Sequence, residues 1–317
     1  MKKATIILLA LAFLFTLATP EFTNAQDGGP IRVGSKQFNE QLVLGQLMLV
    51  ALEYNGYEVE DRTGLASTVV ARQALLNDEI DMYAEYNGTG ISIHFNDVDI
   101  VDADEIIQYS GDSFASYAIV SSLDAAINDL IWLQPAPANN TYVFVVKREF
   151  AEEHGIYTAQ DLADYVNLGG EVVVSTGNEF ATREDGIPAY EETYGFAFPD
   201  GSLNIIADGT PAQCLQALNE SAGGANVAMS YGTTGENTAY DIVVLEDPDG
   251  AQPVYAPAPV VRGEVLRANP EIATILNPIF ATLDNATLQT LNARVGVQGE
   301  APRDVAEDYL RQMGFID

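Results

Sequence analysis

The stretch Ile80-Asp81-Met82-Tyr83-Ala84-Glu85-Tyr86-Asn87-Gly88-Thr89 decides the fold, because it closes a β-α-β-α-β series. A strand-like run ends there in a turn signal, which places Tyr86 at the mouth of a loop rather than inside a core. Before it, the residue pattern predicts strands at 31–34 and 57–60, each followed by a helix. This order predicts a parallel sheet whose loops at the carboxyl ends of the strands carry the site.

The first helix is expected to be long and amphipathic. Ser35 or Asn39 is predicted to cap its start, and Asn55-Gly56 is a stop signal. Its apolar side is expected to consist of Leu42, Leu44, Leu47, Met48, Val50, Ala51 and Leu52.

A second set of strands and helices follows, and two proline-rich crossings near 135 and 250 separate it from the first set. Three further tyrosines lie at segment ends within or beside it: Tyr142, Tyr231 and Tyr255. The tail is predicted to be helical. The sequence therefore predicts an α/β protein with two lobes, the first formed by 26–137 and 250–317 and the second by 138–249.

The amino terminus has the features of a secretory signal peptide. Lys2 and Lys3 precede an apolar run that is too short to span a membrane, and small residues up to Ala25 mark a cleavage site. We expect cleavage after residue 25 and an extracytoplasmic protein. Because no cysteine follows the apolar run, we expect no lipid anchor.

The chain is strongly acidic, with 14 basic and 46 acidic side chains. Removal of residues 1–25 takes away two lysines and one glutamate, which leaves a net charge of −33. This balance argues against nucleic acid or an anionic membrane surface as a partner. A solvated acidic surface is the favoured explanation, and a field that attracts cationic solutes is the alternative.

Few residues are available for metal or nucleophilic chemistry. The single cysteine, Cys214, excludes an internal disulfide and a thiolate cluster, and its neighbours predict a buried helical thiol. Of the two histidines, His94 and His154, the second is read as a helix end. The acidic stretch at 96–105 lacks the glycine and spacing of a calcium loop, so a solvated turn is preferred. No metal or cofactor is expected.

The four tyrosines, Tyr86, Tyr142, Tyr231 and Tyr255, are predicted to surround one bound cation. A quaternary ammonium group cannot donate a hydrogen bond, so a site holds it through desolvation and the negative faces of aromatic rings. Tyrosine suits this role because its hydroxyl stays hydrogen-bonded while its face is presented.

Two cationic side chains are candidate partners for a carboxylate on the same solute. These are Lys36 and Arg183, the second as a two-pronged clamp that follows a strand and lies beside a helix start.

Several motifs resemble the substrate-binding proteins of glycine betaine/carnitine/choline ABC importers, the osmoprotectant family. The resemblance covers nearly the whole mature chain in the right order. It rests on the segments 31–41, 81–89, 132–133, 139–142, 180–186, 245–247, 255–262 and 291–292.

The resemblance implies a type II periplasmic binding protein, in which two lobes close over a ligand cleft. It places Tyr86, Tyr142, Tyr231 and Tyr255 at the aromatic cage, and Lys36, Asn140 and Arg183 at the polar groups of the ligand. It also implies a non-catalytic, monomeric protein that delivers its ligand to a membrane permease and ATPase.

The chain departs from the family pattern at Gly232–Glu236, where the family usually has Thr-Thr-Asp-Gly-Arg, and at Gln252–Tyr255, where it usually has Phe-Pro-Pro-Tyr. Both changes leave the neighbouring tyrosines, Tyr231 and Tyr255, in place.

Three alternatives remain beside the main interpretation. They are a secreted hydrolase that uses paired carboxylates, a binding protein of the same fold for another small solute, and a ligand-sensing module of a receptor. No Gly-x-Ser-x-Gly, phosphate-loop or His-Glu-x-x-His motif supports the enzyme.

Overall fold

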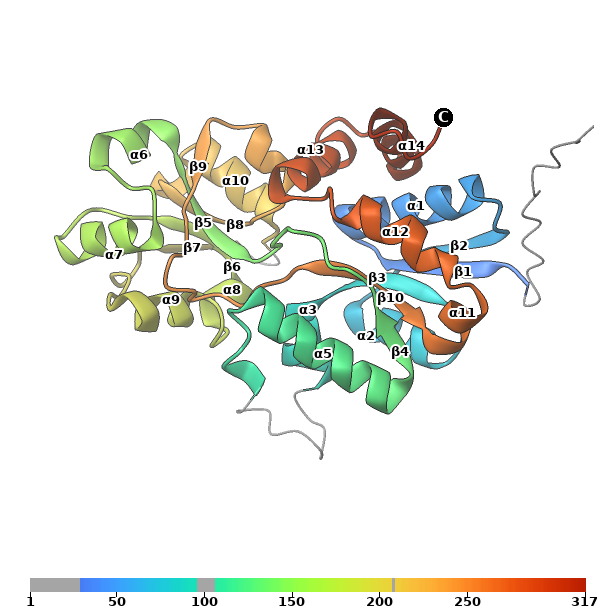
Figure 1. The fold of residues 1–317 in the computed structure, drawn as a ribbon. Coiled ribbons are helices and arrows are strands. Elements are labelled where there is room, and N and C mark those ends of the chain that lie inside the picture. The colour runs from blue at the N-terminus through green and yellow to red at the C-terminus, as the bar shows by residue number, and fades with distance from the viewer. Residues whose placement is uncertain (1–28, 96–105, 207–208) are drawn as a thin grey trace, which may run out of the picture.

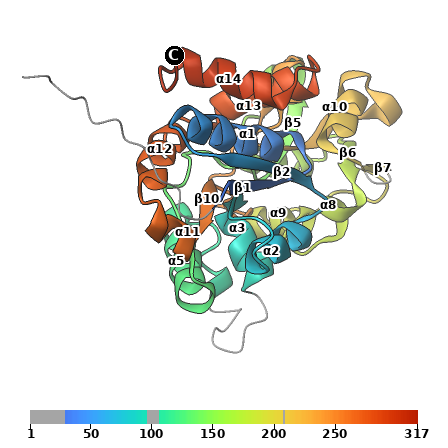
Figure 2. The ribbon, with the colours of Figure 1, turned by 90° about the vertical axis from the view of Figure 1, so that its right-hand side faces the viewer.

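The computed structural model describes residues 29–95, 106–206 and 209–317. They form two five-stranded sheets in two lobes that lie side by side, each sheet covered by helices (Figures 1 and 2). The expected α/β class with two lobes is confirmed. The signal-peptide prediction at 1–25 and the acidic stretch at 96–105 fall outside the described residues.

The first sheet has the strand order β2-β1-β3-β10-β4. β1 runs parallel to β2 and β3, whereas β10 runs antiparallel to β3 and β4. The expected parallel arrangement is therefore confirmed for β1, β2 and β3. It is wrong for the complete sheet, because β10 enters from the other lobe and runs antiparallel to both of its neighbours. The strands are β1 (Ile31–Lys36), β2 (Val59–Leu65), β3 (Met82–Tyr86), β4 (Leu130–Trp132) and β10 (Pro257–Arg262).

The second sheet repeats this plan in the order β7-β6-β8-β5-β9. β6 is parallel to β7 and β8, and β5, which enters from the first lobe, is antiparallel to β8 and β9. The strands are β5 (Tyr142–Lys147), β6 (Val174–Gly177), β7 (Leu203–Ile206), β8 (Val227–Tyr231) and β9 (Ile242–Val244).

Helix α1 (Asn39–Tyr54) is buried on nearly all sides rather than amphipathic. It packs against the first sheet and also against the C-terminal helices, which explains why Val43 and Leu49 are buried too. The predicted stop at Asn55-Gly56 is confirmed, since Asn55 caps the end of the helix, but the predicted N-terminal caps, Ser35 or Asn39, are wrong. Phe38 holds the cap position without a side-chain bond, because Ser35 is still part of β1 and binds Lys36 and Gly64.

The other helices cover both sheets, and the tail is helical as predicted. Thr158 and Asp161 form a capping box at the start of one of them, and His154 ends another. They are α2 (Thr68–Leu76), α3 (Asn87–Thr89), α5 (Ser113–Asn128), α6 (Arg148–His154), α7 (Ala159–Asn167), α8 (Asn178–Thr182), α9 (Ile187–Tyr194), α10 (Pro211–Asn219), α11 (Gly263–Ala268), α12 (Glu271–Phe280), α13 (Asn285–Gly296) and α14 (Pro302–Gln312), with short turns η1 (Gly90–His94), η2 (Ala222–Gly224) and η3 (Gly235–Thr238).

The C-terminal helices complete the core of the first lobe. Leu276 of α12, Leu288 of α13 and Leu310 of α14 are fully buried in one cluster with α1. A separate cluster fills the second lobe and contains Cys214, the buried helical thiol that was expected. The lobe boundaries near 137 and 250 stay a prediction.

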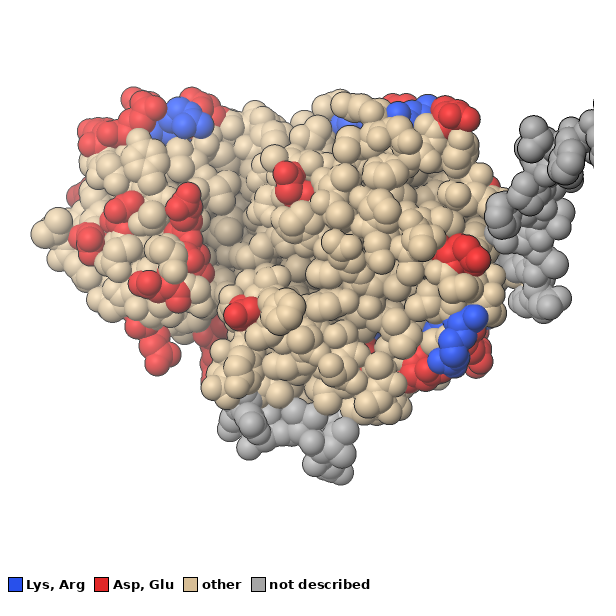
Figure 3. Space-filling view, in the orientation of Figure 1, with Lys and Arg blue, Asp and Glu red and all other residues tan. Residues whose placement is uncertain are grey.

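The surface carries its acidic side chains unevenly. On the face in Figure 3, Asp and Glu gather mainly on the lobe of β5–β9, at the left. Among the described residues, no helix has both the length and the apolar character needed to cross a membrane.

Candidate ligand-binding site

Two chain segments cross between the lobes and are bonded to each other. The backbone NH of Asn140 donates to the carbonyl of Tyr255 at 3.0 Å, and the NH of Tyr255 donates to Oδ1 of Asn139 at 2.8 Å. Thr141 Oγ1 also donates to the carbonyl of Pro253 at 2.7 Å. The crossings therefore hold Tyr142 and Tyr255 in a fixed relation between the sheets.

The second lobe contributes a wall of stacked rings. Tyr142 begins β5 and pairs with Tyr231, the last residue of β8. Their ring centroids lie 4.9 Å apart, and Tyr142 stacks on the fully buried ring of Phe180 at 4.6 Å. Burial raises the pKa of both tyrosines, so their phenols stay neutral.

The first lobe contributes Tyr86, and here the sequence-based expectation is wrong. Tyr86 is the last residue of β3 and is only 3% exposed, so its ring is buried rather than at a loop mouth. It is buried because Phe38 stacks on it at a centroid distance of 6.4 Å, and its hydroxyl donates to Glu40 at 2.7 Å.

Tyr255 lies against Gly88, which follows Tyr86 in the chain. A Cβ at residue 88 would lie 2.8 Å from Cδ1 of the Tyr255 ring, so only glycine permits this approach. Asn87 holds the same segment, since its Oδ1 accepts from the NH of Ala256 at 2.7 Å.

Lys36 is part of a buried ion pair. Its Nζ lies 2.6 Å from Oε1 of Glu85 and 5.1 Å from the centroid of Tyr86. Burial alone would raise the pKa of Glu85, but Lys36 and His94 outweigh that effect and hold it below its usual range. Lys36 therefore already has a partner within the protein.

Arg183 is paired as well, but closer to solvent. Its guanidinium binds Asp185 and Glu179, at 2.5 and 2.8 Å, and these contacts raise its pKa. Its Cζ lies 6.0 Å from the centroid of Tyr142. The guanidinium is thus beside the ring wall of the second lobe, and its role toward a ligand stays a prediction.

Asn140 lies between the two lobes. Its Nδ2 donates to Glu40 at 3.1 Å and lies 3.5 Å from the hydroxyl of Tyr86. Among the described residues its buried Oδ1 has no partner. An unsatisfied buried acceptor of this kind can take a hydrogen bond from a ligand or a water molecule.

The segment Gly232–Glu236, which departs from the family pattern, packs against α13. A Cβ on Gly235 would lie 2.2 Å from the backbone N of Ala293, so the two backbones touch. The carbonyl of Thr233 accepts from Nδ2 of Asn292 at 2.8 Å. The departure therefore affects how the second lobe meets α13.

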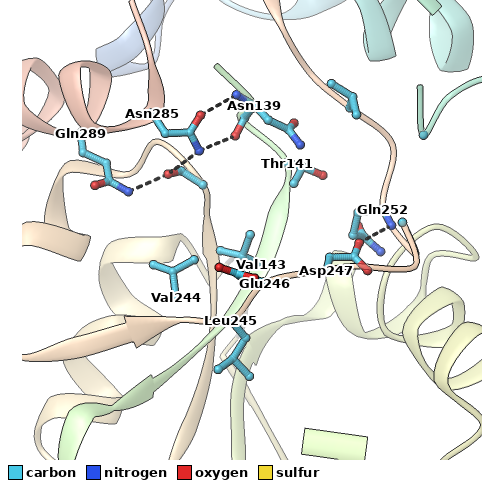
Figure 4. Close-up of a pocket in the computed structure, with 14 residues that line it drawn as sticks. Asn139, Thr141, Val143, Val244, Leu245, Glu246, Asp247, Gln252, Asn285 and Gln289 are labelled. Carbon is cyan, nitrogen blue, oxygen red and sulfur yellow. Dashed lines mark hydrogen bonds between the residues drawn. The ribbon is translucent and has the colours of Figure 1, made fainter. Parts of the chain in front are cut away.

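A cavity of about 460 Å³ lies on the other side of the crossing segments (Figure 4). Asn139 and Thr141 line it, while Asn140 and Tyr142, which alternate with them in an extended segment, face the rings. Gln252 also lines it. None of the seven predicted site residues lines this space, so it is separate from the predicted cage.

Three residues near the rings escaped the sequence reasoning: Phe38, Glu40 and Phe180. Glu40 is buried at the start of α1 between the polar residues Asn39 and Gln41, so its sequence neighbours give no sign of its burial. Within the described part of the chain, no group of three or more His, Cys, Asp or Glu is placed to hold a metal ion. The site thus presents rings, paired cations and one buried carboxylate, Glu40, that is paired with no basic side chain among the described residues.

The chain was compared with known proteins. A family model described as the substrate binding domain of ABC-type glycine betaine transport systems matches residues 29–312. The glycine betaine-binding protein YehZ of Escherichia coli is 41% identical over 290 residues, 92% of each chain. A glycine-betaine-binding protein of Pseudomonas aeruginosa is 34% identical over 293 residues, 90% of this chain and 89% of that protein.

The solved structure of apo YehZ from Escherichia coli has a TM-score of 0.80 at 40% identity and covers 91% of this chain and 100% of its own. A crystal structure named as a glycine betaine/carnitine/choline ABC transporter, at 23% identity, has the same fold, with a TM-score of 0.79 over 90% of this chain and 100% of its own.

Proposed function

The chain belongs to the family of substrate-binding domains of ABC-type glycine betaine transport systems, and from this premise we propose that it captures a quaternary ammonium solute outside the cytoplasm. It delivers the solute to a membrane permease that an ATPase drives. In this proposal the protein acts as a monomer without catalysis, after a signal peptide is removed at Ala25.

The observation that carries the proposal is the placement of tyrosines at the facing ends of both sheets. Tyr142 and Tyr231 lie on the second lobe, Tyr86 on the first and Tyr255 on a crossing segment. Rings in this arrangement suit a cation that offers no hydrogen-bond donor. Lys36, Asn140 and Arg183 are proposed to meet the polar groups of the same solute.

Rings from two lobes also explain how binding drives closure. A ligand that contacts both walls binds the closed state more tightly than the open state, so it shifts the population toward closure. The bonded crossing segments allow the lobes to move as rigid bodies about them.

The proposal is tested with isothermal titration calorimetry and thermal shift on the purified protein. The ligands are glycine betaine, choline, carnitine, proline and simple amino acids. We expect saturable binding and a raised melting temperature with quaternary ammonium compounds only, and unchanged ligand recovered afterwards. Binding only of other solutes would mean that the scaffold serves a different substrate, and turnover would favour an enzyme.

A further inference from the structure

The structure describes four fully or nearly fully buried carboxylates, and three of them are ion-paired. Glu85 is bound to Lys36 at 2.6 Å. The other two pairs are Asp124 with Arg72, at 2.5 Å, and Asp81 with Arg32, at 2.6 Å. Glu40, the fourth, is 3% exposed, and among the described residues no basic side chain is paired with it.

The partners of Glu40 are all neutral. Its Oε1 accepts from the hydroxyl of Tyr86 at 2.7 Å and from Nδ2 of Asn140 at 3.1 Å, and its Oε2 accepts from Nδ2 of Asn292 at 2.8 Å. These donors lie on β3, on a crossing segment and on α13. Hydrogen bonds satisfy the oxygens, but the negative charge itself is left without a counter-charge.

A buried charge without a counter-charge is costly, and proteins rarely keep one. Glu40 lies in the first turn of α1, whose end offers only a partial positive charge. Burial raises the pKa of Glu40 despite hydrogen bonds that oppose the rise. Nearby, Lys36 and Glu85 neutralise each other, so the charge balance around Tyr86 stays negative by about one unit.

We propose that the positive charge of the bound solute is the missing counter-charge of Glu40, and that Glu40 is a specificity-determining residue acting through the phenol of Tyr86. This inference rests on the proposed function. A phenol that donates to a carboxylate has a more electron-rich ring, so its face attracts a cation more strongly. Glu40 thereby makes the site prefer a cationic solute over a neutral solute of the same shape, in addition to any selection for the shape of the trimethylated group.

The magnitude follows from Coulomb's law. A solute cation that contacts the Tyr86 ring lies about 8 Å from the carboxylate, which at an effective dielectric constant of about 20 corresponds to about a 30-fold difference in affinity. A neutral solute of the same shape gains nothing from this field.

The test compares choline with 3,3-dimethylbutanol, its uncharged isostere, by calorimetry and competition on the full protein and on Glu40→Gln. We expect Glu40→Gln to weaken choline by about 30-fold and the isostere by less than about 3-fold. The affinity for glycine betaine should fall less than the affinity for choline, because in the wild type Glu40 also repels the carboxylate of glycine betaine. If Glu40→Gln weakens all three alike, the inference is overturned while the proposed function stands.

A second pair of variants keeps the test decisive if Glu40→Gln does not fold. Tyr86→Phe removes the hydroxyl that binds Glu40. It should lower the ratio of the affinity for choline to the affinity for the isostere. Tyr117→Phe, in the same lobe but outside the proposed site, is the matched control, because its hydroxyl donates to the carbonyls of Trp132 and Leu133 rather than to a carboxylate, and its ratio should not change. Equal ratios in both variants would refute the role of Glu40. A wild-type protein that binds neither choline nor glycine betaine would refute the proposed function together with this inference.

Discussion

Replacement of Tyr142 by alanine tests the aromatic wall most directly. Its ring stacks on Phe180 at 4.6 Å and contacts Tyr231 at 4.9 Å, so the substitution removes one face of the proposed cage and loosens a second. A single cation–π contact contributes up to about 2 kcal/mol, which corresponds to about a 30-fold loss of affinity. We expect Tyr142→Ala to weaken the binding of glycine betaine or choline by more than about 10-fold and by up to about that factor.

The assay is calorimetric titration, with the melting temperature of each variant as a check on folding. Loss of two aromatic contacts should lower the free energy of unfolding by about 1–3 kcal/mol, which leaves the protein folded for the titration. Tyr142→Phe is the control, because it keeps the ring and should bind within about 3-fold of wild type. An unchanged affinity in Tyr142→Ala would remove this ring from the site, and an equal loss in Tyr142→Phe would mean that the hydroxyl, not the face, binds the ligand.

Three further predictions concern the framework around the site. Glu85→Gln should cost about 3–5 kcal/mol in denaturant unfolding, because it leaves a buried ammonium unpaired, and a loss below about 1 kcal/mol would contradict the buried pair. Gly235→Ala should lower the melting temperature sharply, since its Cβ would lie 2.2 Å from the backbone N of Ala293, whereas Gly111→Ala, with 3.8 Å to the nearest atom, should melt with much less change. The thiol of Cys214 should not react with Ellman's reagent at pH 8 in the native protein, because burial raises its pKa to about 11. It should react fully in denaturant. Rapid labelling of the native protein would mean that the second lobe opens.

Local patterns explain why much of the fold was predictable. The helix stop at Asn55-Gly56 and the strand that ends at Tyr231 depend on residues close in sequence, and both occur where the pattern placed them. The two proline-rich crossings likewise mark where the chain leaves one sheet for the other.

The errors involve partners that are distant in sequence. The antiparallel entry of β10 follows from its return from the second lobe, which no local pattern records. Tyr86 is buried because Phe38 and Glu40 cover it, 48 and 46 residues earlier in the chain. Glu40 in turn meets Asn292, which lies 252 residues away, so its lack of a basic partner is visible only in three dimensions.

The ion pairs of Lys36 and Arg183 lead to an expectation for how a zwitterionic solute is oriented. Lys36 and Arg183 are both paired already, so a ligand carboxylate has to compete with protein carboxylates for either one. Replacing the protein carboxylate by a ligand carboxylate costs less free energy at Arg183, whose side chain is 36% exposed, than at Lys36, whose side chain is 5% exposed. The reason is that a buried ion pair costs more to break than an exposed one. We therefore expect the carboxylate to face Arg183 on the second lobe and the ammonium to face Tyr86 and Glu40 on the first. A solute held in this way links the lobes by opposite charges at its two ends, so the charges and the rings both favour the closed state.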